Sequence, residues 1–176
     1  MKEIVFESLQ DNAARLIGKQ WMMITAGTMG ADGDSSACNT MTASWGGLGY
    51  MWNRPVAYVF VRPNRHTAPL INEHASFTLS FMPEKYRQDL MYCGRHSGRD
   101  GNKFEQCALQ PMALPSGLVA LQDADLVLEC RKMYVQELSE AGFCDWSEVS
   151  PQWYEEGNPL HVMYVAELSH CWQREA

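Results

Sequence analysis

Residues 62–67, with the sequence RPNRHT, gather two arginines, a histidine and a threonine directly after the apolar run VAYVFV. The guanidinium groups of Arg62 and Arg65 can each form paired hydrogen bonds with phosphate oxygens. Thr67 adds a hydroxyl, and a helix beginning there offers backbone N–H groups without intrahelical partners. These residue types at this spacing indicate a site for a phosphomonoester, which carries about two negative charges near neutral pH. The alternative is that both arginines are solvated or pair with surface acids, as exposed charges usually do.

Two further stretches have residue types that suit a binding site. Residues 46–50, GGLGY, contain three glycines, which mark either a turn or a close approach of the backbone to another group. Residues 94–105, GRHSGRDGNKFE, form a polar loop that is too charged for the core and too long for a tight turn. Considered alone, residues 42–47, TASWGG, are equally an ordinary strand that ends in a glycine turn, and the polar loop is equally a solvated surface loop. His66 by itself suits a capping or packing role better than catalysis.

The charge balance restricts the classes of partner. The 176 residues include 14 lysines and arginines against 21 aspartates and glutamates, a formal net charge of -7. Such a chain does not suit a nucleic acid or an anionic membrane, so the cationic stretch at 62–67 indicates a local anion. No apolar run reaches the roughly 18 residues that span a bilayer. The first residues, MKEIVFESLQ, carry acids where a signal peptide needs an apolar stretch, so we expect a cytoplasmic protein.

The length and the cysteine content of the chain favour a single domain without disulfide bonds. A chain of this size can bury a sufficient core by itself, and we expect a single domain over residues 1–176. We expect the six cysteines to be reduced thiols, buried as small hydrophobic groups. No cysteine and histidine grouping repeats at the spacing of a zinc site, so we expect no metal.

The hydrophobic pattern predicts mainly strands joined by brief helices. A helix is predicted from Glu7 to about Gly18, another over 67–74 with Thr67 as its N-cap and Pro69 in its first turn, and a third over 84–93. Strands are predicted at 21–28, 55–62, 76–82, 124–138 and 161–168. The alternation in 76–82 predicts a half-buried strand, and Glu129 is expected on the outer face of its strand. This order favours an antiparallel barrel or sandwich over a doubly wound sheet.

Several of these segments together resemble the flavin reductase-like family, in its flavoredoxin and flavin reductase branch. The segments are NTMTASWGGLGYMWNRPVAYVFVRPNRHT, FTLSF, CGRHSGRDGNKF and LVLECR, which occur in the order seen in that family over most of the chain. The resemblance implies a mainly β protein, an FMN-binding split β-barrel of Greek-key type with short flanking helices. It also implies a homodimer with FMN held near the subunit interface.

The same resemblance implies three groups of FMN-binding residues. The phosphate would be bound by Arg62, Arg65, His66 and Thr67. The isoalloxazine ring would lie along Asn39, Thr42, Ala43, Ser44 and Trp45. The third segment would place Ser97, Arg99, Asp100 and Lys103 near the ribityl chain, the phosphate or the ring. The chain departs from the family pattern at Asn102, where an aspartate is usual, and the spacing of Cys38 and Cys93 gives no support for a thiol relay.

The implied activity is NAD(P)H:flavin reduction, in which a nicotinamide delivers hydride to the flavin and electrons pass to an acceptor. NADH or NADPH would be a transient co-substrate, and Arg99 or Lys103 would stabilise negative charge that develops on the ring. The acceptor could be free flavin, a partner protein or ferric iron. One alternative is a flavoredoxin-type electron carrier reduced by a protein partner. Another is a non-catalytic binder of FMN or of a phosphate ligand.

Overall fold

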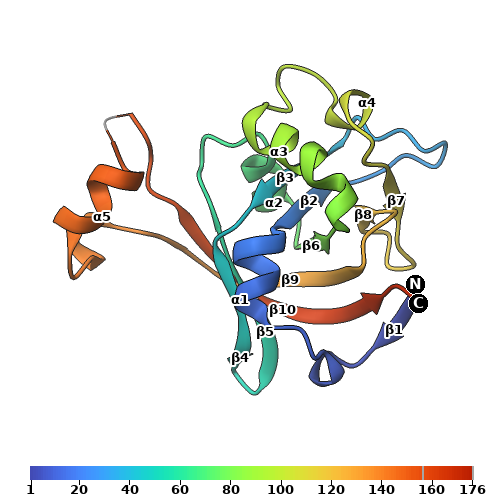
Figure 1. Cartoon of the computed structure of the whole chain (residues 1–176), viewed down its shortest axis with the longest axis horizontal. Helices are drawn as coiled ribbons and strands as arrows, with labels where there is room; N and C mark the ends of the chain where they lie inside the picture. Colours follow the sequence, from blue (N-terminus) through green and yellow to red (C-terminus); the bar gives the residue numbers. More distant parts are fainter. Residues whose placement is uncertain (156, 176) are drawn as a thin grey trace.

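The computed structural model describes residues 1–155 and 157–175, and it is built mainly from antiparallel strands (Figure 1). Within these residues, eight strands form one sheet in the order β3-β2-β6-β9-β10-β5-β4, with β1 paired to β10. The strands of this sheet are β1 Lys2–Ile4, β2 Met22–Gly27, β3 Cys38–Ala43, β4 Gly46–Met51, β5 Arg54–Val61, β6 Ser76–Phe81, β9 Leu126–Glu137 and β10 Val162–Gln173. Two short strands, β7 Pro111–Ala113 and β8 Val119–Leu121, form a separate ribbon. The predicted mainly β, antiparallel class is confirmed.

Short helices lie between the strands, and most of them cover one end of the barrel (Figure 1). They are α1 Ala13–Arg15, α2 Thr67–Glu73, α3 Arg87–Arg95, α4 Lys103–Gln106 and α5 Trp146–Trp153, with single turns η1 Phe6–Ser8, η3 Glu84–Tyr86 and η4 Glu140–Gly142, and a π-helical turn η2 Leu16–Gln20. The helices predicted over 67–74 and 84–93 are present. The first helix was predicted to start too early. It begins after Asn12, whose side chain accepts a hydrogen bond from the Arg15 N–H at 3.0 Å, and it continues through Gly18.

The alternation of polar and apolar residues in β6 predicted that one face of this strand is exposed, but this face is buried. Thr78 and Ser80 are both inaccessible to solvent. The β7–β8 ribbon covers them: the Thr78 hydroxyl donates to the Val119 carbonyl at 2.6 Å, and the Ser80 hydroxyl accepts from the Leu121 N–H at 3.3 Å. A second apolar cluster, beneath α3, α4 and this ribbon, therefore complements the main core inside the barrel. Small hydroxyl side chains can occupy such a face because each finds a backbone partner.

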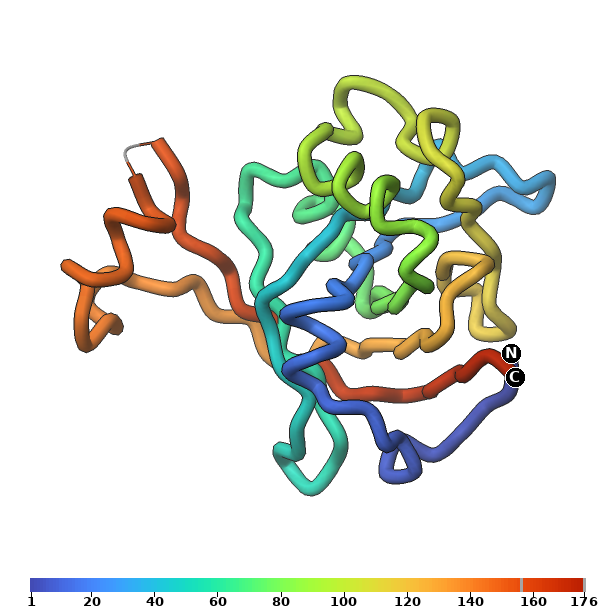
Figure 2. The backbone as a smooth tube through the Cα atoms, in the orientation of Figure 1, coloured from blue at the N-terminus to red at the C-terminus, as the bar shows by residue number. Residues whose placement is uncertain are grey.

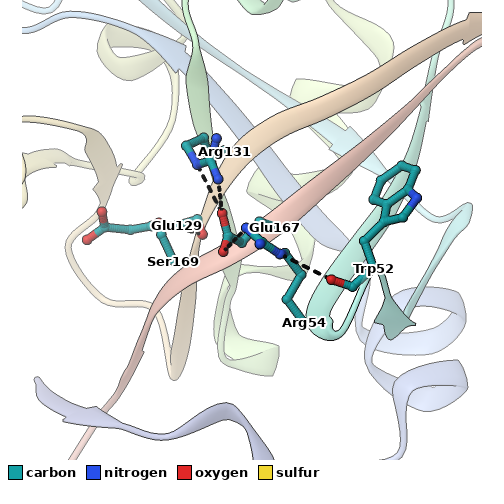
Figure 3. Close-up of polar contacts among 6 residues, drawn as sticks. All are labelled: Trp52, Arg54, Glu129, Arg131, Glu167 and Ser169. Atoms are coloured by element: carbon teal, nitrogen blue, oxygen red, sulfur yellow. Dashed lines mark hydrogen bonds and ion pairs between the residues drawn. The ribbon is translucent and has the colours of Figure 1, made fainter.

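Glu129 was predicted on the outer face, and this was wrong, because the residue is 1% exposed. Its carboxylate accepts a hydrogen bond from the Trp172 indole N–H at 2.7 Å, which compensates for its burial. The charged residue on the outer face of the neighbouring strand is Glu167, on which two arginines converge (Figure 3). Arg54 Nη1 lies 3.0 Å from one of its carboxylate oxygens and Arg131 Nε 3.0 Å from the other. This ion-pair cluster joins β5, β9 and β10.

The glycine-rich stretch forms strand β4 and not a turn. Gly46 pairs with Val59 in the β4–β5 hairpin, and the turn itself falls at Trp52 and Asn53, which both have positive φ angles. A side chain at Gly46 would overlap the carbonyl oxygen of Tyr58 on the neighbouring strand. Of the two roles that the sequence allows for these glycines, the close backbone approach is the one present at Gly46.

β9 and β10 extend beyond the barrel and carry a projecting segment with α5 at its far end (Figure 2). We call this segment, residues 138–155 and 157–161, the arm. The exposed part of β9 that leads into it carries Met133, Tyr134 and Val135, which are all solvent-accessible. No helix or strand was predicted between residues 138 and 161. The two ends of the described chain lie together on the opposite side of the molecule, since Lys2 pairs with Gln173.

The close approach at Gly46 generates a stability prediction. We expect Gly46→Ala to lower the free energy of unfolding by about 1–3 kcal/mol, because the new methyl group meets a fixed backbone oxygen. Gly47→Ala is the matched control, since its methyl group would lie 3.5 Å from the Tyr58 ring, an ordinary contact. Urea unfolding of both variants measures the difference. Equal stabilities would contradict the proposed packing of β4 against β5.

Candidate functional site

Two loops, one strand and the end of helix α3 border a cavity of about 130 Å³ at the helical end of the barrel, which we call the phosphate-side pocket. The loops are residues 62–66, after β5, and residues 96–102, between α3 and α4. The strand is β3, whose residues form the floor. The cavity is lined by Asn39, Met41, Thr42, Asn64, Arg65, His66, Thr67, Cys93, Gly94, His96, Ser97, Gly98, Arg99 and Lys103.

Direct contacts bind the two loops to each other. The Arg99 guanidinium donates to the Asn64 carbonyl at 3.0 Å. Gly98 lies so close to Asn39 and His66 that a side chain at this position would overlap both. The sequence separates these loops by about 30 residues, and the fold makes them opposite walls of one cavity.

Thr67 is not the N-cap that the sequence predicts. The cap position belongs to His66, whose side chain makes no capping hydrogen bond, while Thr67 is the first residue of α2 and is buried. Its oxygen accepts a hydrogen bond from the Asn39 side-chain amide at 2.7 Å. A hydroxyl that accepts in this way keeps its own proton to donate. Pro69 lies in the first turn of the helix, as predicted.

Lys103 was assigned to a loop too charged for the core, yet both Lys103 and Phe104 are buried. The Lys103 amine donates to the carbonyls of Thr40, at 2.9 Å, and Cys93, at 2.8 Å. Desolvation by this burial lowers the pKa of Lys103. Two of its three donors therefore hold strand β3 to helix α3, and they are not directed at a ligand.

The remaining residues of the third segment have separate roles. Ser97 and Arg99 line the phosphate-side pocket, and Asp100 is exposed and lies outside the lining. Asn102, the departure from the family pattern, is the N-cap of α4: its side-chain oxygen accepts from the Phe104 N–H at 3.0 Å. Aspartate and asparagine are equally good N-caps, so the exchange preserves this helix start.

A second hollow of about 230 Å³ adjoins the first and shares Met41, Thr42 and Arg65 with it. We call it the ring-side pocket. Strand β3 and the residues after it form one side, and the arm contributes to the other. Its lining consists of Met41, Thr42, Ala43, Ser44, Trp45, Phe60, Arg62, Arg65, Trp153 and His161.

Arg62 lines only the ring-side pocket, whereas the other three residues of its predicted phosphate group all line the phosphate-side pocket. Its Nη2 donates to the Trp153 carbonyl at 2.6 Å, and its guanidinium lies 5.5 Å from the centre of the Tyr154 ring. Its Nη1 is buried and has no hydrogen-bond partner among the described residues. A buried donor without a partner is costly. An acceptor atom of a bound ligand would satisfy it.

The arm brings Trp153 and His161 to this pocket, and neither residue was predicted from the sequence. The Trp45 ring contacts Trp153 edge-to-face at 4.9 Å between centroids and lies 4.8 Å from His161. The Tyr154 hydroxyl and His161 Nδ1 lie 2.9 Å apart. Desolvation, with smaller effects of Arg62 and Arg65, lowers the pKa of His161 to about 4. The available signal was the aromatic enrichment of 146–154, followed by a histidine at the start of a strand.

The donor set fits a ligand with an anionic tail and a flat aromatic body. Arg65, Arg99 and the hydroxyls of Thr67 and Ser97 surround the first pocket, while small residues of β3 and the aromatic ring of Trp45 border the second. The free Nη1 of Arg62 suits a carbonyl edge of that body. FMN has these three features, so the residues present fit it.

Across residues 1–155 and 157–175, no histidine, cysteine, aspartate and glutamate side chains gather in a set that could hold a metal ion. The helices of the same residues are all too short or too polar to cross a membrane.

Comparison with known proteins places the chain in a family. Residues 14–176 match the family model of the flavin reductase like domain, so the chain belongs to the flavin reductase-like family. A comparison with curated proteins gives no match. The resemblance inferred from the sequence motifs is therefore confirmed.

Solved structures share the fold at low sequence identity. A flavoredoxin from Methanosarcina acetivorans is 20% identical with a TM-score of 0.66, over 89% of this chain and 69% of that one. An FMN-binding protein from Thermus thermophilus is 18% identical with a TM-score of 0.66, over 100% and 83% of the two chains. The styrene monooxygenase flavin reductase from Pseudomonas putida S12 is 16% identical with a TM-score of 0.60, over 89% and 81%. These similarities establish the split-barrel fold.

The depressed pKa of His161 generates a prediction about pH and stability. Between the ordinary histidine pKa of 6.5 and about 4, the unfolded chain binds a proton that the folded chain does not. The folded state therefore loses stability as the pH falls through this window, by up to about 2 kcal/mol between pH 7 and pH 5. His161→Gln removes the titrating group, so its stability should fall less over the same interval.

The measurement is urea unfolding of the wild-type protein and His161→Gln at both pH values. All other groups titrate in both proteins. The stability lost between pH 7 and pH 5 by the wild type, minus that lost by His161→Gln, therefore measures the contribution of His161. Identical losses in the two proteins would show that His161 is not buried in its neutral form.

Proposed function

We propose that this protein binds FMN, with the phosphate in the phosphate-side pocket and the isoalloxazine ring along residues 42–45 in the ring-side pocket. The observation that carries the proposal is the junction of the two pockets: Met41, Thr42 and Arg65 line both. A cationic, hydroxyl-rich cavity thus continues into one lined by small and aromatic side chains. Family membership supports the same ligand.

Arg65 and Arg99 would supply charge-assisted hydrogen bonds to the phosphate, joined by the Thr67 and Ser97 hydroxyls and by His66. Asn39 would act by holding the Thr67 oxygen, which leaves the Thr67 proton to be donated. Asp100 is exposed beyond the pocket lining, so we propose no direct contact for it.

We propose that the reaction is NAD(P)H:flavin reduction. Bound FMN would accept hydride from a nicotinamide, and the protein would bind both, orient them and stabilise charge. Arg62 is the cation of the ring-side pocket with an unused buried donor, so we assign it the stabilisation of negative charge on the carbonyl edge of the ring. The sequence pointed to Arg99 or Lys103 for this role, but the Lys103 amine is directed at backbone carbonyls.

The arm supports a place for the nicotinamide. Trp153 lines the ring-side pocket and is 47% exposed, so it offers an aromatic surface that a planar ring can contact. His161 beside it is neutral above about pH 4 and adds no charge to the pocket. Transient binding here requires no dinucleotide-binding motif, and none occurs in the sequence.

We further propose a homodimer in the cytoplasm with the FMN site near the subunit interface. The exposed apolar residues Met133, Tyr134 and Val135, at the base of the arm, support a contact between subunits. Reduced flavin would pass its electrons to free flavin, a partner protein or ferric iron.

The first test measures FMN affinity. We expect the wild-type protein to bind FMN with quenching of the flavin fluorescence, and Arg65→Met to bind about ten to one hundred times more weakly, because one charge-assisted interaction with the phosphate is lost. Arg15→Met is the control, since Arg15 lies on α1 and its side chain is 68% exposed. The riboflavin affinity of Arg65→Met should fall less than its FMN affinity, because riboflavin has no phosphate. A wild-type protein that binds no FMN would refute the proposal.

The second test separates the reductase from its alternatives. We expect anaerobic NADH or NADPH to bleach the visible absorption band of the FMN-loaded protein, and Arg62→Met to slow this bleaching while FMN stays bound. A loaded protein that neither nucleotide bleaches, but that dithionite reduces, would contradict the reductase and favour the flavoredoxin-type carrier.

Analytical ultracentrifugation of the wild-type protein and of Tyr134→Ser tests the proposed homodimer. A monomeric wild-type protein would contradict it.

A further inference from the structure

We propose that a third hollow, beside the ring-side pocket, binds a small aromatic carboxylate with a single ring. This hollow has a volume of about 230 Å³ and lies between the start of β2 and helix α3. It shares Thr42 with both pockets described above, Ser44 with the ring-side pocket and Gly94 with the phosphate-side pocket. We call it the Trp21 pocket, and its remaining lining residues are Trp21, Leu90, Met91 and Arg95.

Trp21 adopts a backbone conformation that is normally found only in glycine. Its φ and ψ angles are 72° and 152°. In this region the side chain of any other residue crowds the backbone, so a tryptophan here destabilises the chain locally. Outliers of this kind cluster at active sites and ligand-binding sites. The strain therefore indicates a function for the indole ring at this position.

Arg87 fixes the indole ring from outside the pocket. Its guanidinium carbon lies 3.8 Å from the centre of the Trp21 ring. The same guanidinium donates to the carbonyls of Lys19, at 2.6 Å, and Gln20, at 3.2 Å. Arg87 does not belong to the lining of the Trp21 pocket, so the indole surface that borders the pocket is not the surface under the guanidinium. That free surface can contact a second planar group.

The neighbouring apolar walls and the volume suit one aromatic ring. Leu90 is buried, and Met91 is 37% exposed and has a flexible thioether that makes favourable contacts with aromatic rings. The Thr42 hydroxyl donates to the Leu90 carbonyl at 2.5 Å, which joins β3 to α3 beside the pocket. An apolar cavity of about 150 Å³ is known to hold benzene. A hollow of about 230 Å³ therefore has room for one substituted ring and not for the three fused rings of a flavin.

Arg95 supplies the charge that a carboxylate requires. Its side chain is exposed, and it has no ion-pair partner within residues 1–155 and 157–175. None of the described residues that line the Trp21 pocket is acidic. The Ser44 hydroxyl, at the border with the ring-side pocket, is a second donor. A bound aromatic acid would thus place its ring against Trp21 and its carboxylate at Arg95.

The shared residues put this ligand beside the proposed flavin ring. Thr42 and Ser44 line both the Trp21 pocket and the ring-side pocket. If the proposed flavin site is correct, an aromatic acid in the Trp21 pocket would border the ring of FMN. Trp21 and Arg95 have no part in the proposed FMN site, so the new site is tested with FMN-free protein.

The test titrates the FMN-free, full-length protein with benzoate by isothermal titration calorimetry. We expect one benzoate per chain, and binding of benzamide, which lacks the charge, about ten times weaker or more. Cyclohexanecarboxylate keeps the charge but has no aromatic ring, and it should bind about two to ten times more weakly than benzoate. In the NMR spectrum, the indole N–H signal of Trp21 should shift when benzoate is added.

Three variants locate the site. Arg95→Met should bind benzoate about ten times more weakly or less, whereas Arg65→Met, in the phosphate-side pocket, should bind it as the wild type does. Trp21→Gly suits the strained backbone, so this variant should fold and yet lose benzoate binding. Trp21→Phe keeps an aromatic ring and should retain most of the affinity, and it also assigns the Trp21 signal.

A wild-type protein that does not bind benzoate, or that binds benzoate and benzamide equally, would overturn the proposal. Loss of benzoate binding in Arg65→Met but not in Arg95→Met would do the same, because the ligand would then lie in the phosphate-side pocket. An unshifted Trp21 signal decides against the site even where a variant does not fold. Because no measurement uses FMN, a protein that fails to bind FMN can still bind benzoate, and the reverse.

Discussion

The buried ammonium of Lys103 is the interaction on which the site depends. A charge removed from water is tolerated only where hydrogen bonds replace its hydration, and here the Thr40 and Cys93 carbonyls do so. These carbonyls belong to β3 and α3, the floor and one wall of the phosphate-side pocket. The requirement to satisfy one cation therefore fixes the distance between two walls. The neighbouring thiol of Cys107 is held by the same residue, through its carbonyl.

A second set of contacts places the arm against the barrel. Arg62 donates to the Trp153 carbonyl and faces the Tyr154 ring, while Trp45 packs against Trp153 and His161. The aromatic contacts bury apolar area, and Arg62 keeps one buried donor free. The arm thereby completes a pocket that β3 alone leaves open on one side. An acidic protein concentrates cationic donors at this end of its barrel, which gives a local preference for anions despite a net charge of -7.

Most patterns that depend on near neighbours were read correctly. The strand over 55–62, the helix after it and the antiparallel class follow from β-branched runs, Pro69 and the order of the strands. Two local details were wrong, the start of the first helix and the N-cap of α2. The other errors arose where distant segments changed the environment of a residue. Thr78 and Ser80 are polar and alternate with apolar residues, yet β8 covers them. Lys103 and Glu129 carry charges, yet distant carbonyls and an indole N–H compensate for their burial.

The sequence by itself determined the sheet-rich class and which residues carry cations, hydroxyls and thiols, because these are properties of composition and short-range order, while the family followed from the resemblance of its motifs. Only the tertiary structure decided how they are grouped. It left Arg62 out of the lining of the phosphate-side pocket, turned Thr67 toward Asn39 and brought His161 to Trp45. The physical reason is that a pocket is formed by contacts between segments far apart in the chain, and the spacing of residues along one segment contains no information about those distances.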